Sequence, residues 1–64
     1  MSKLFTFLEN FHVDNLIKIY ENGELIFEGK MGDVPQRITN MTSVVRGTAK
    51  WNGEYLEVAV KKCW

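Results

Sequence analysis

The sequence predicts an α+β domain in which an N-terminal helix packs on a four-stranded antiparallel sheet made of two β-hairpins. Three features favour this fold class. An amphipathic stretch opens the chain, and two pairs of apolar runs follow it, each pair divided by an Asn-Gly dipeptide. Asn-Gly between apolar runs is the strongest short-range signal of a hairpin, because both residues tolerate positive φ.

The 64 residues are expected to form one domain, 1–64. A domain of this size buries only about 60% of the surface that its unfolded chain exposes, so its stability is marginal. Packing a helix on the sheet, or associating with a second copy, adds stability to such a chain. One alternative architecture stays open, because bends at Gly29, Gly32 and Gly47 would curl the strands into a small SH3-like or Sm-like barrel preceded by a helix.

The N-terminal helix is expected at about residues 3–11. Leu4, Leu8 and Phe11 recur at positions i, i+4 and i+7, which share one face of a helix. Two further phenylalanines, Phe5 and Phe7, flank this face. About three helical turns are too few to persist alone in water, so the helix must pack on the sheet.

The first hairpin is expected over Leu16–Lys30, with strands at about 16–20 and 24–30. Together the two strands contain Ile, Phe and Tyr, which favour extended structure. Side chains alternate between the two faces of a strand, so a one-residue slip in register would exchange the buried and exposed sets.

The turn of this hairpin has two alternatives. A two-residue turn would place Glu21 opposite Glu24, a like-charge pair. A three-residue loop with Gly23 in the left-handed position of a bulge avoids that pair, and we expect this form. It also gathers four apolar side chains on one face, in the pairs Ile19–Leu25 and Ile17–Phe27.

A short irregular or 3₁₀ turn is expected at Asp33–Ile38, between the two hairpins. Pro35 fits the first turn of a helical segment, where its missing N–H costs nothing. Ile38 and Met41 are expected to cover an edge of the core.

The second hairpin is expected to have strands at about 43–51 and 54–62. A two-residue turn at Asn52-Gly53 would join them, with the cross-strand pairs Ala49–Leu56 and Val45–Val60. In the second strand, three apolar residues alternate with small or charged ones, as in a half-buried strand: Leu56, Val58 and Val60.

Eight basic and eight acidic residues leave the chain with no formal net charge. Nucleic-acid-binding domains usually carry a basic excess, so this balance counts against that function. No apolar run approaches the roughly 20 residues of a membrane span. The N-terminal stretch reaches Glu9 before an apolar signal region develops, so a cytoplasmic protein is expected.

The chain has one histidine, His12, and one cysteine, Cys63. No disulfide can form within it, and two such residues cannot supply the four ligands of a structural zinc site. Catalysis by His12 would need a positioned partner, and only Asp14 lies close in sequence. We therefore expect no catalytic residue, no metal and no cofactor, and hence a protein that is not an enzyme.

The residues most suited to binding lie on the second hairpin and on the outer side of the first. Trp, Tyr and Arg supply most hot spots of protein interfaces, which favours a protein partner. Basic side chains among aromatics also bind single-stranded nucleic acid, which is the alternative. A third interpretation is that the aromatic side chains merely cover the sheet. The candidate binding residues are Trp51, Tyr55, Arg46, Lys50 and Tyr20.

The first half of the chain resembles small uncharacterised proteins of phages and mobile elements in low-GC Gram-positive bacteria. The similarity lies in three segments, Leu8-Glu9-Asn10-Phe11, Ile19-Tyr20 and Gly29 to Pro35. It implies a compact accessory protein that binds, and regulates or inhibits, a host protein. A small nucleic-acid- or nucleotide-binding barrel is the alternative function, and a homo-oligomer is an alternative assembly.

Overall fold

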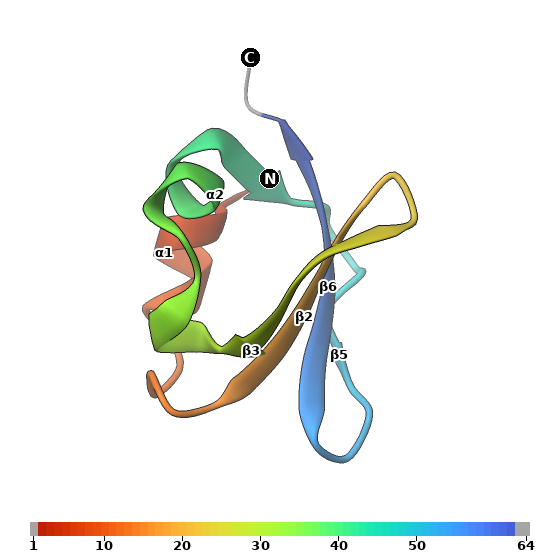
Figure 1. Ribbon diagram of the computed structural model, residues 1–64. Helices are drawn as coiled ribbons and strands as arrows, with labels where there is room; N and C mark the ends of the chain where they lie inside the picture. The colour runs from red at the N-terminus through yellow and green to blue at the C-terminus, as the bar shows by residue number, and fades with distance from the viewer. Residues whose placement is uncertain (1, 63–64) are drawn as a thin grey trace.

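The computed structural model describes residues 2–62 and has an α+β fold, which confirms the expected class. Two short α-helices lie on one face of a twisted mixed sheet (Figure 1). Cys63 lies outside the described residues. In chain order the elements are β1 Ser2–Lys3, α1 Leu4–Leu8, β2 Leu16–Glu21, β3 Glu24–Lys30, the 3₁₀ helix η1 Met31–Asp33, α2 Gln36–Met41, β4 Thr42–Val44, β5 Lys50–Trp51 and β6 Tyr55–Lys62.

The strand order in the sheet is β1-β4-β6-β2-β3, and β5 also pairs with β6. β6 therefore has β2 on one side and β4 and β5 on the other. β2 and β6 run parallel, from Leu16 beside Tyr55 to Glu21 beside Val60, and the remaining pairs are antiparallel.

The expected all-antiparallel sheet is thus wrong where the two hairpins meet, and the barrel alternative is wrong because the sheet is not closed. Parallel neighbours need a long crossover between them, usually one that contains a helix. The segment from Asn22 to Glu54, which includes α2, provides that crossover.

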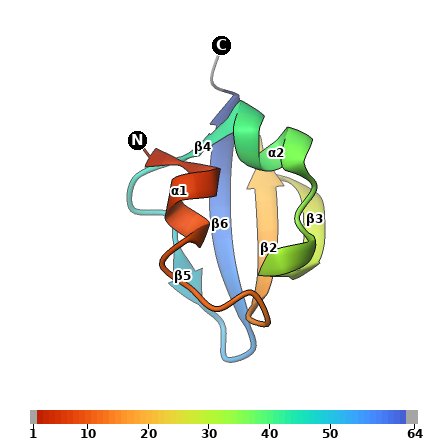
Figure 2. The ribbon, with the colours of Figure 1, turned by 90° about the vertical axis from the view of Figure 1, so that its left-hand side faces the viewer.

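The core lies between the sheet and the two helices, which Figure 2 shows in front of β6 and β2. Burial of β6 at alternate positions is as expected, and so is burial of Ile17 and Ile19 in β2. The buried apolar residues are Leu4, Ile17, Ile19, Met31, Ile38, Val44, Leu56, Val58 and Val60.

The first hairpin has a two-residue turn in place of the expected three-residue loop. Asn22 and Gly23 have φ of 54° and 82°, as a type I′ turn requires. The extra residue is absorbed further along β3 as a bulge at Ile26, between the pairs Tyr20–Leu25 and Ile19–Phe27. The two glutamates beside the turn do face each other, but charges next to water repel weakly, so the backbone preference of Asn-Gly prevails.

This register also overturns the expected inner face of the hairpin. Ile17 lies opposite Gly29 rather than Phe27. Leu25, expected in the core, pairs with Tyr20 and is 44% exposed.

The strand expected at 43–51 is broken into β4 and β5. Val44 pairs with Val60, and Lys50 pairs with Glu57. Five residues, 45–49, therefore lie opposite two residues of β6, 58–59, and the excess forms a turn at Val45–Thr48. The expected pair Val45–Val60 is wrong because Val44 lies opposite Val60, and the expected pair Ala49–Leu56 is wrong because Trp51 lies opposite Leu56.

The Thr48 hydroxyl bridges the interruption between β4 and β5. It accepts a hydrogen bond from the Ala59 N–H at 3.2 Å and donates one to the Val45 carbonyl at 2.6 Å. In a continuous strand a backbone carbonyl would accept the Ala59 N–H of β6. The Thr48 hydroxyl accepts it here instead.

The turn between β5 and β6 contains two residues, as expected, but lies one position later. The Asn52 N–H donates to the Tyr55 carbonyl at 3.0 Å, which leaves Gly53-Glu54 as the loop. The Asn52 side-chain oxygen accepts the N–H groups of Glu54 and Tyr55 at 3.2 and 2.8 Å. This arrangement shifts β5 so that Trp51 lies opposite Leu56.

Helix α1 is shorter than the expected helix at 3–11. After Leu8 the chain tightens into turns, the last of which is closed by the Phe11 N–H and the Leu8 carbonyl at 3.1 Å. The Asn10 side chain donates to the Phe7 carbonyl at 3.2 Å and so competes with continuation of the helix. Leu4 is fully buried, whereas its neighbour Phe5 is 53% exposed.

Two helical segments, η1 and α2, occupy the region expected to form a single turn at Asp33–Ile38. Ile38 is buried as expected, but Met41 is 44% exposed. The buried Thr42 hydroxyl donates to the Ile38 carbonyl at 2.7 Å, which satisfies one of the carbonyls left open at the end of α2.

Candidate protein-binding face

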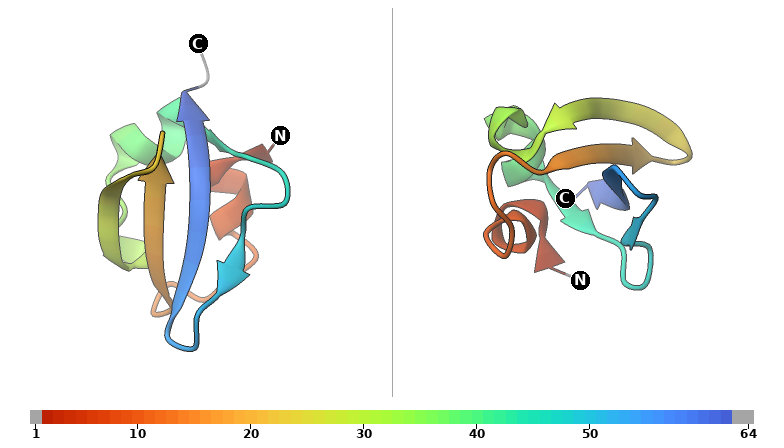
Figure 3. Two further views of the ribbon diagram at one scale, coloured as in Figure 1. Left: turned by 90° about the vertical axis from the view of Figure 1, so that its right-hand side faces the viewer. Right: turned by 90° about the horizontal axis from the view of Figure 1, so that it is seen from below.

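The face of the sheet opposite the helices is the largest candidate surface. No helix among residues 2–62 covers it, and Figure 3 shows β3, β2, β6 and β5 side by side in front of the helices. Because Ile17, Ile19 and Leu56 face the core, their neighbours in sequence face outward. We call these residues the outer face: Leu16, Lys18, Tyr20, Leu25, Glu28, Lys30, Lys50, Tyr55, Glu57 and Ala59.

A row of charges crosses the middle of the outer face. Lys18 on β2 is paired with Glu28 on β3 and with Glu57 on β6. Glu57 is paired in turn with Lys50 on β5. Residues that pair across strands share a face, so four strands present negative, positive, negative and positive charge in that order.

Two largely apolar rows flank the charged row. On one side Leu16 lies between Lys30 and Tyr55, and on the other Tyr20 lies between Leu25 and Ala59. Leu16, Tyr20 and Tyr55 are half-buried by their neighbours, so each keeps part of an apolar surface exposed to solvent.

Tyr55 is held by its surroundings on the outer face. The Lys18 ammonium lies 4.8 Å from the centroid of the Tyr55 ring, a cation–π contact. Loss of hydration raises the pKa of the Tyr55 phenol above its ordinary value of 10.0, and Glu28 and then Glu54 raise it further, while Lys18 lowers it. The phenol is therefore neutral at physiological pH and retains its donor hydrogen.

Glu57 is fixed by the turn that precedes β6. The Asn52 side-chain nitrogen donates a hydrogen bond to one carboxylate oxygen of Glu57. The Asn52 side-chain oxygen accepts hydrogen bonds from the backbone of the turn, which fixes the Asn52 side chain. The Glu57 carboxylate that it contacts therefore has a defined position in the charged row.

The structure brings together three of the five candidate residues. Tyr55, Lys50 and Tyr20 share the outer face. Trp51 lies on the helix side of the sheet, because it pairs with the buried Leu56. Arg46 lies exposed on the turn between β4 and β5, away from the charged row.

Trp51 belongs to an aromatic cluster on the helix side. Its ring meets that of Phe11 edge-on at 6.2 Å, and Phe11 lies 5.3 Å from Phe7. Trp51 nevertheless stays 54% exposed. Trp51 therefore partly covers the aromatic residues at the end of α1. It does not share a surface with Tyr55, which lies on the opposite face of the sheet.

Lys18 and Glu57 are members of the outer face that were not among the candidate residues. The signal that identifies Lys18 is the alternation of Ile17 and Ile19, which sends the residue between them outward. Its position beside Glu57 depends on the parallel register of β2 and β6, for which the sequence carries no comparable signal.

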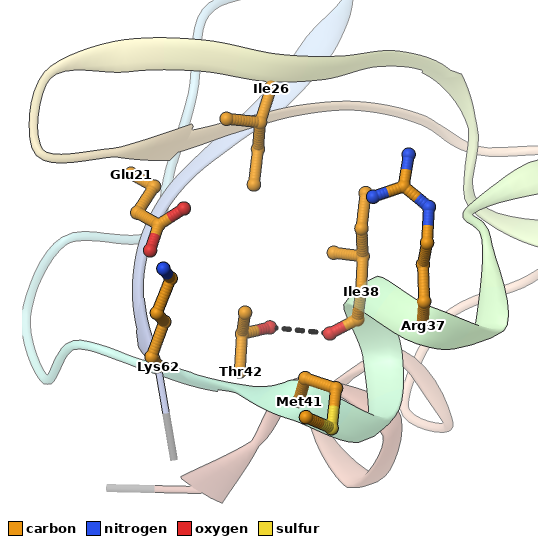
Figure 4. A pocket seen from close by; sticks show the side chains of 7 residues that line it. All are labelled: Glu21, Ile26, Arg37, Ile38, Met41, Thr42 and Lys62. Atoms are coloured by element: carbon orange, nitrogen blue, oxygen red, sulfur yellow. Dashed lines mark hydrogen bonds between the residues drawn. The ribbon is translucent and has the colours of Figure 1, made fainter. Parts of the chain in front are cut away.

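Two grooves lie on the helix side. One, of about 510 Å³, runs between α1 and the η1–α2 segment and is mostly apolar, with Phe5, Leu8 and Phe11 in its wall. The other, of about 450 Å³, is bounded by α2 and by the ends of β2 and β6 (Figure 4). In Figure 4 the Glu21 and Lys62 side chains point toward each other at one end of this groove.

His12 and Asp14 are neighbours in the loop before β2. The imidazole Nδ1 accepts the Asp14 N–H at 3.2 Å and lies 3.7 Å from the Asp14 carboxylate. Both side chains are about 70% exposed, at 73% and 70%, so the contact orders a surface loop. Within residues 2–62 no three His, Cys, Asp or Glu side chains gather closely enough to hold a metal ion.

No family model, curated protein or solved structure matches the chain. Among the helices of residues 2–62, none has the length and apolar character that crossing a membrane requires. The geometry of the outer face is therefore the basis for a functional proposal.

Proposed function

We propose that the protein is a non-enzymatic interaction module that binds another protein through the outer face. The observation that supports this proposal is a sheet face without a helix over it that still carries Tyr20, Tyr55 and Leu16. In most folds a second layer of secondary structure covers apolar side chains on the face of a sheet. Tyrosine is also a frequent anchor residue of protein interfaces.

The charges of the outer face favour a protein over a nucleic acid. Binding to a phosphate backbone relies on several cations that act together. Lys18 has a glutamate on each side, and Lys50 has Glu57 beside it, so the middle row offers no continuous cationic track. A row of alternating charges is instead complementary to a protein surface whose charges alternate in the opposite order.

The resemblance of the first half of the chain to phage and mobile-element proteins supplies the biological setting of this proposal. In that setting the protein acts in the cytoplasm as an accessory factor that regulates or inhibits a host protein. The small size and the balanced charge of the chain fit a module that works by occupying a surface.

Affinity capture with the tagged chain as bait, from a lysate of low-GC Gram-positive cells, tests this function. Tyr55→Ser and Lys50→Glu alter the outer face, and Phe5→Ser and Arg37→Glu are matched controls on exposed positions of the helix side. We expect captured proteins to be lost with the first pair and kept with the second. If folded outer-face variants keep every captured protein, the outer face is not the binding surface.

Single-stranded oligonucleotides test the alternative. We expect no mobility shift at low salt, because the two lysines of the charged row, Lys18 and Lys50, each lie opposite a glutamate. A shift that weakens steeply with added salt would favour nucleic acid over protein.

A further inference from the structure

We propose that the outer face binds a second copy of this chain, with the two sheets face to face about a two-fold axis that runs parallel to β2 and β6. This inference rests on the proposed function, a protein-binding outer face, and names a second copy of the chain as one occupant of that surface. It follows from the order of charges in the middle row and from the sizes of the side chains in the two flanking rows.

The middle row is complementary to its own rotated copy. A two-fold axis along the strands, between β2 and β6, reverses the order in which a second copy presents the row. Lys18 then meets Glu57 of the second copy, and Glu28 meets Lys50 of the second copy. Each contact occurs twice, so all eight charges of the two rows face an opposite charge. A row of like charges, or one with mirror-symmetric signs, would repel its own copy in this arrangement.

The flanking rows fit the same operation. The axis leaves each row opposite its own copy, so Tyr20 meets Ala59 of the second copy, a large side chain over a small one. In the other row Leu16 meets Tyr55 of the second copy, an aliphatic side chain over an aromatic ring. Sheets that pack face to face are about 10 Å apart, a gap that such side chains fill.

The edge of the sheet is a poorer contact for a second copy. β3 is an edge strand, and its bulge at Ile26 interrupts the regular backbone ladder that edge pairing needs. Charged residues at Glu24 and Glu28 oppose edge pairing further. Of the β3 edge and the uncovered face, the uncovered face is therefore the surface through which two copies associate.

The dimension of the molecule limits the strength of this contact. The chain measures 30 × 20 × 18 Å, so no face is large. Interfaces that bury less than about 1,200 Å² in total are typical of weak, transient contacts. The dimer is expected to form at high protein concentration and to weaken with salt, because its central pairs lie close to solvent.

Sedimentation velocity of the purified chain, from about 10 µM to about 1 mM, tests the dimer. The wild type is expected to shift from monomer to dimer over this range. Glu28→Lys and Lys50→Glu should each raise the dissociation constant about tenfold, since each turns two attractive contacts of the dimer into repulsive ones. Both positions are exposed, so the fold should tolerate these changes.

An equimolar mixture of Glu28→Lys and Lys50→Glu provides the decisive measurement. In a mixed dimer the two lysines of one chain meet the two glutamates of the other, so the mixture should dimerise at least as well as the wild type. Glu9→Lys, just after α1, and Arg37→Glu, in α2, are charge reversals at exposed positions and should leave the dissociation constant unchanged. A monomeric wild type, or a mixture that does not recover, overturns the inference.

NMR spectra give a readout that does not depend on any variant. Amide shifts that change with concentration should be confined to β2, β6 and their outer-face neighbours. Changes confined to the groove beside α1 would overturn the inference. If the purified chain is monomeric but the outer-face variants lose a captured protein from the lysate, the inference fails and the proposed function stands. If neither association occurs, both fail.

Discussion

The ammonium of Lys18 lies over the ring of Tyr55, 4.8 Å from its centroid. The two residues come from β2 and β6, strands that are distant in the sequence and parallel in the sheet. Their contact couples the charged row of the outer face to the apolar row beside it. The ionisation of Tyr55 is therefore a probe of the charges nearest to it, Glu28, Glu54 and Lys18.

Replacing Glu28 with Gln is expected to lower the pKa of Tyr55. The carboxylate of Glu28 disfavours a phenolate beside it, and its removal leaves loss of hydration and the weaker effect of Glu54. Ultraviolet titration of the phenol in a Tyr20→Phe background measures this change. An unchanged or higher pKa would show that Glu28 does not face the phenol.

Stability is expected to fall as the pH rises above about 10. The pKa of Tyr55 is higher in the folded chain than its ordinary value of 10.0, so the folded state binds the phenolic proton more tightly than the unfolded state. The contribution is complete below pH 10 and is lost as the pH rises through the folded-state pKa. Tyr55→Phe should flatten this part of a plot of unfolding free energy against pH, and an unaltered slope would assign it to other groups.

Replacing Thr48 with Val should destabilise the fold by about 1–3 kcal/mol. The change removes the hydroxyl that accepts the Ala59 N–H and donates to the Val45 carbonyl, with little change in side-chain shape. Thr48→Ser keeps the hydroxyl and is the matched control. Urea denaturation measures both, and equal losses in the two variants would mean that the bridge contributes nothing.

Replacing Gly23 with Ala should cost about 1–2 kcal/mol of unfolding free energy. An added Cβ at this position would meet no atom within 4 Å, so the cost comes from the backbone, which has φ of 82°. Asn22→Gly retains the turn geometry and should change the stability by less than about 0.5 kcal/mol. A neutral Gly23→Ala variant would contradict the two-residue turn.

Leu4→Ala should cost about 2–5 kcal/mol, and Phe5→Ala less than about 1 kcal/mol. The two residues are adjacent in α1, but Leu4 is fully buried and Phe5 is 53% exposed. Thermal or urea unfolding distinguishes them. The reverse order would mean that α1 is rotated about its axis relative to the sheet.

Local signals in the sequence located most of the elements of the fold. Asn22-Gly23 marks the first hairpin, and the alternation at Leu56, Val58 and Val60 marks the strand and its buried face. The bulge is predicted at Gly23 but lies at Ile26, because the preference of Asn-Gly for a two-residue turn exceeds the repulsion of the two glutamates beside it. That repulsion is small beside water.

Relations between distant segments could not be predicted in the same way. The run Ile17 to Ile19 is equally suited to a parallel or an antiparallel neighbour, and only the path of the crossover decides between them. The side on which Trp51 lies depends on the turn between β5 and β6, since the loop Gly53-Glu54 sets the register of β5 against β6. Of the candidate site, the sequence therefore predicted Tyr20, Lys50 and Tyr55 as outward residues but not their arrangement beside Lys18.

The position of β6 has a consequence for synthesis of the protein. β6 is made after every other strand of the sheet, yet it lies between β2 and β4. Until β6 has left the ribosome, Ile17 and Ile19 lack the apolar neighbours on β6 that bury them. Pairing of β2 with β6 joins residues that are far apart in the sequence, so it is slow to form. Translation that stops before Leu56 thus yields a product whose core lacks Leu56, Val58 and Val60, and we expect cellular proteases to remove it.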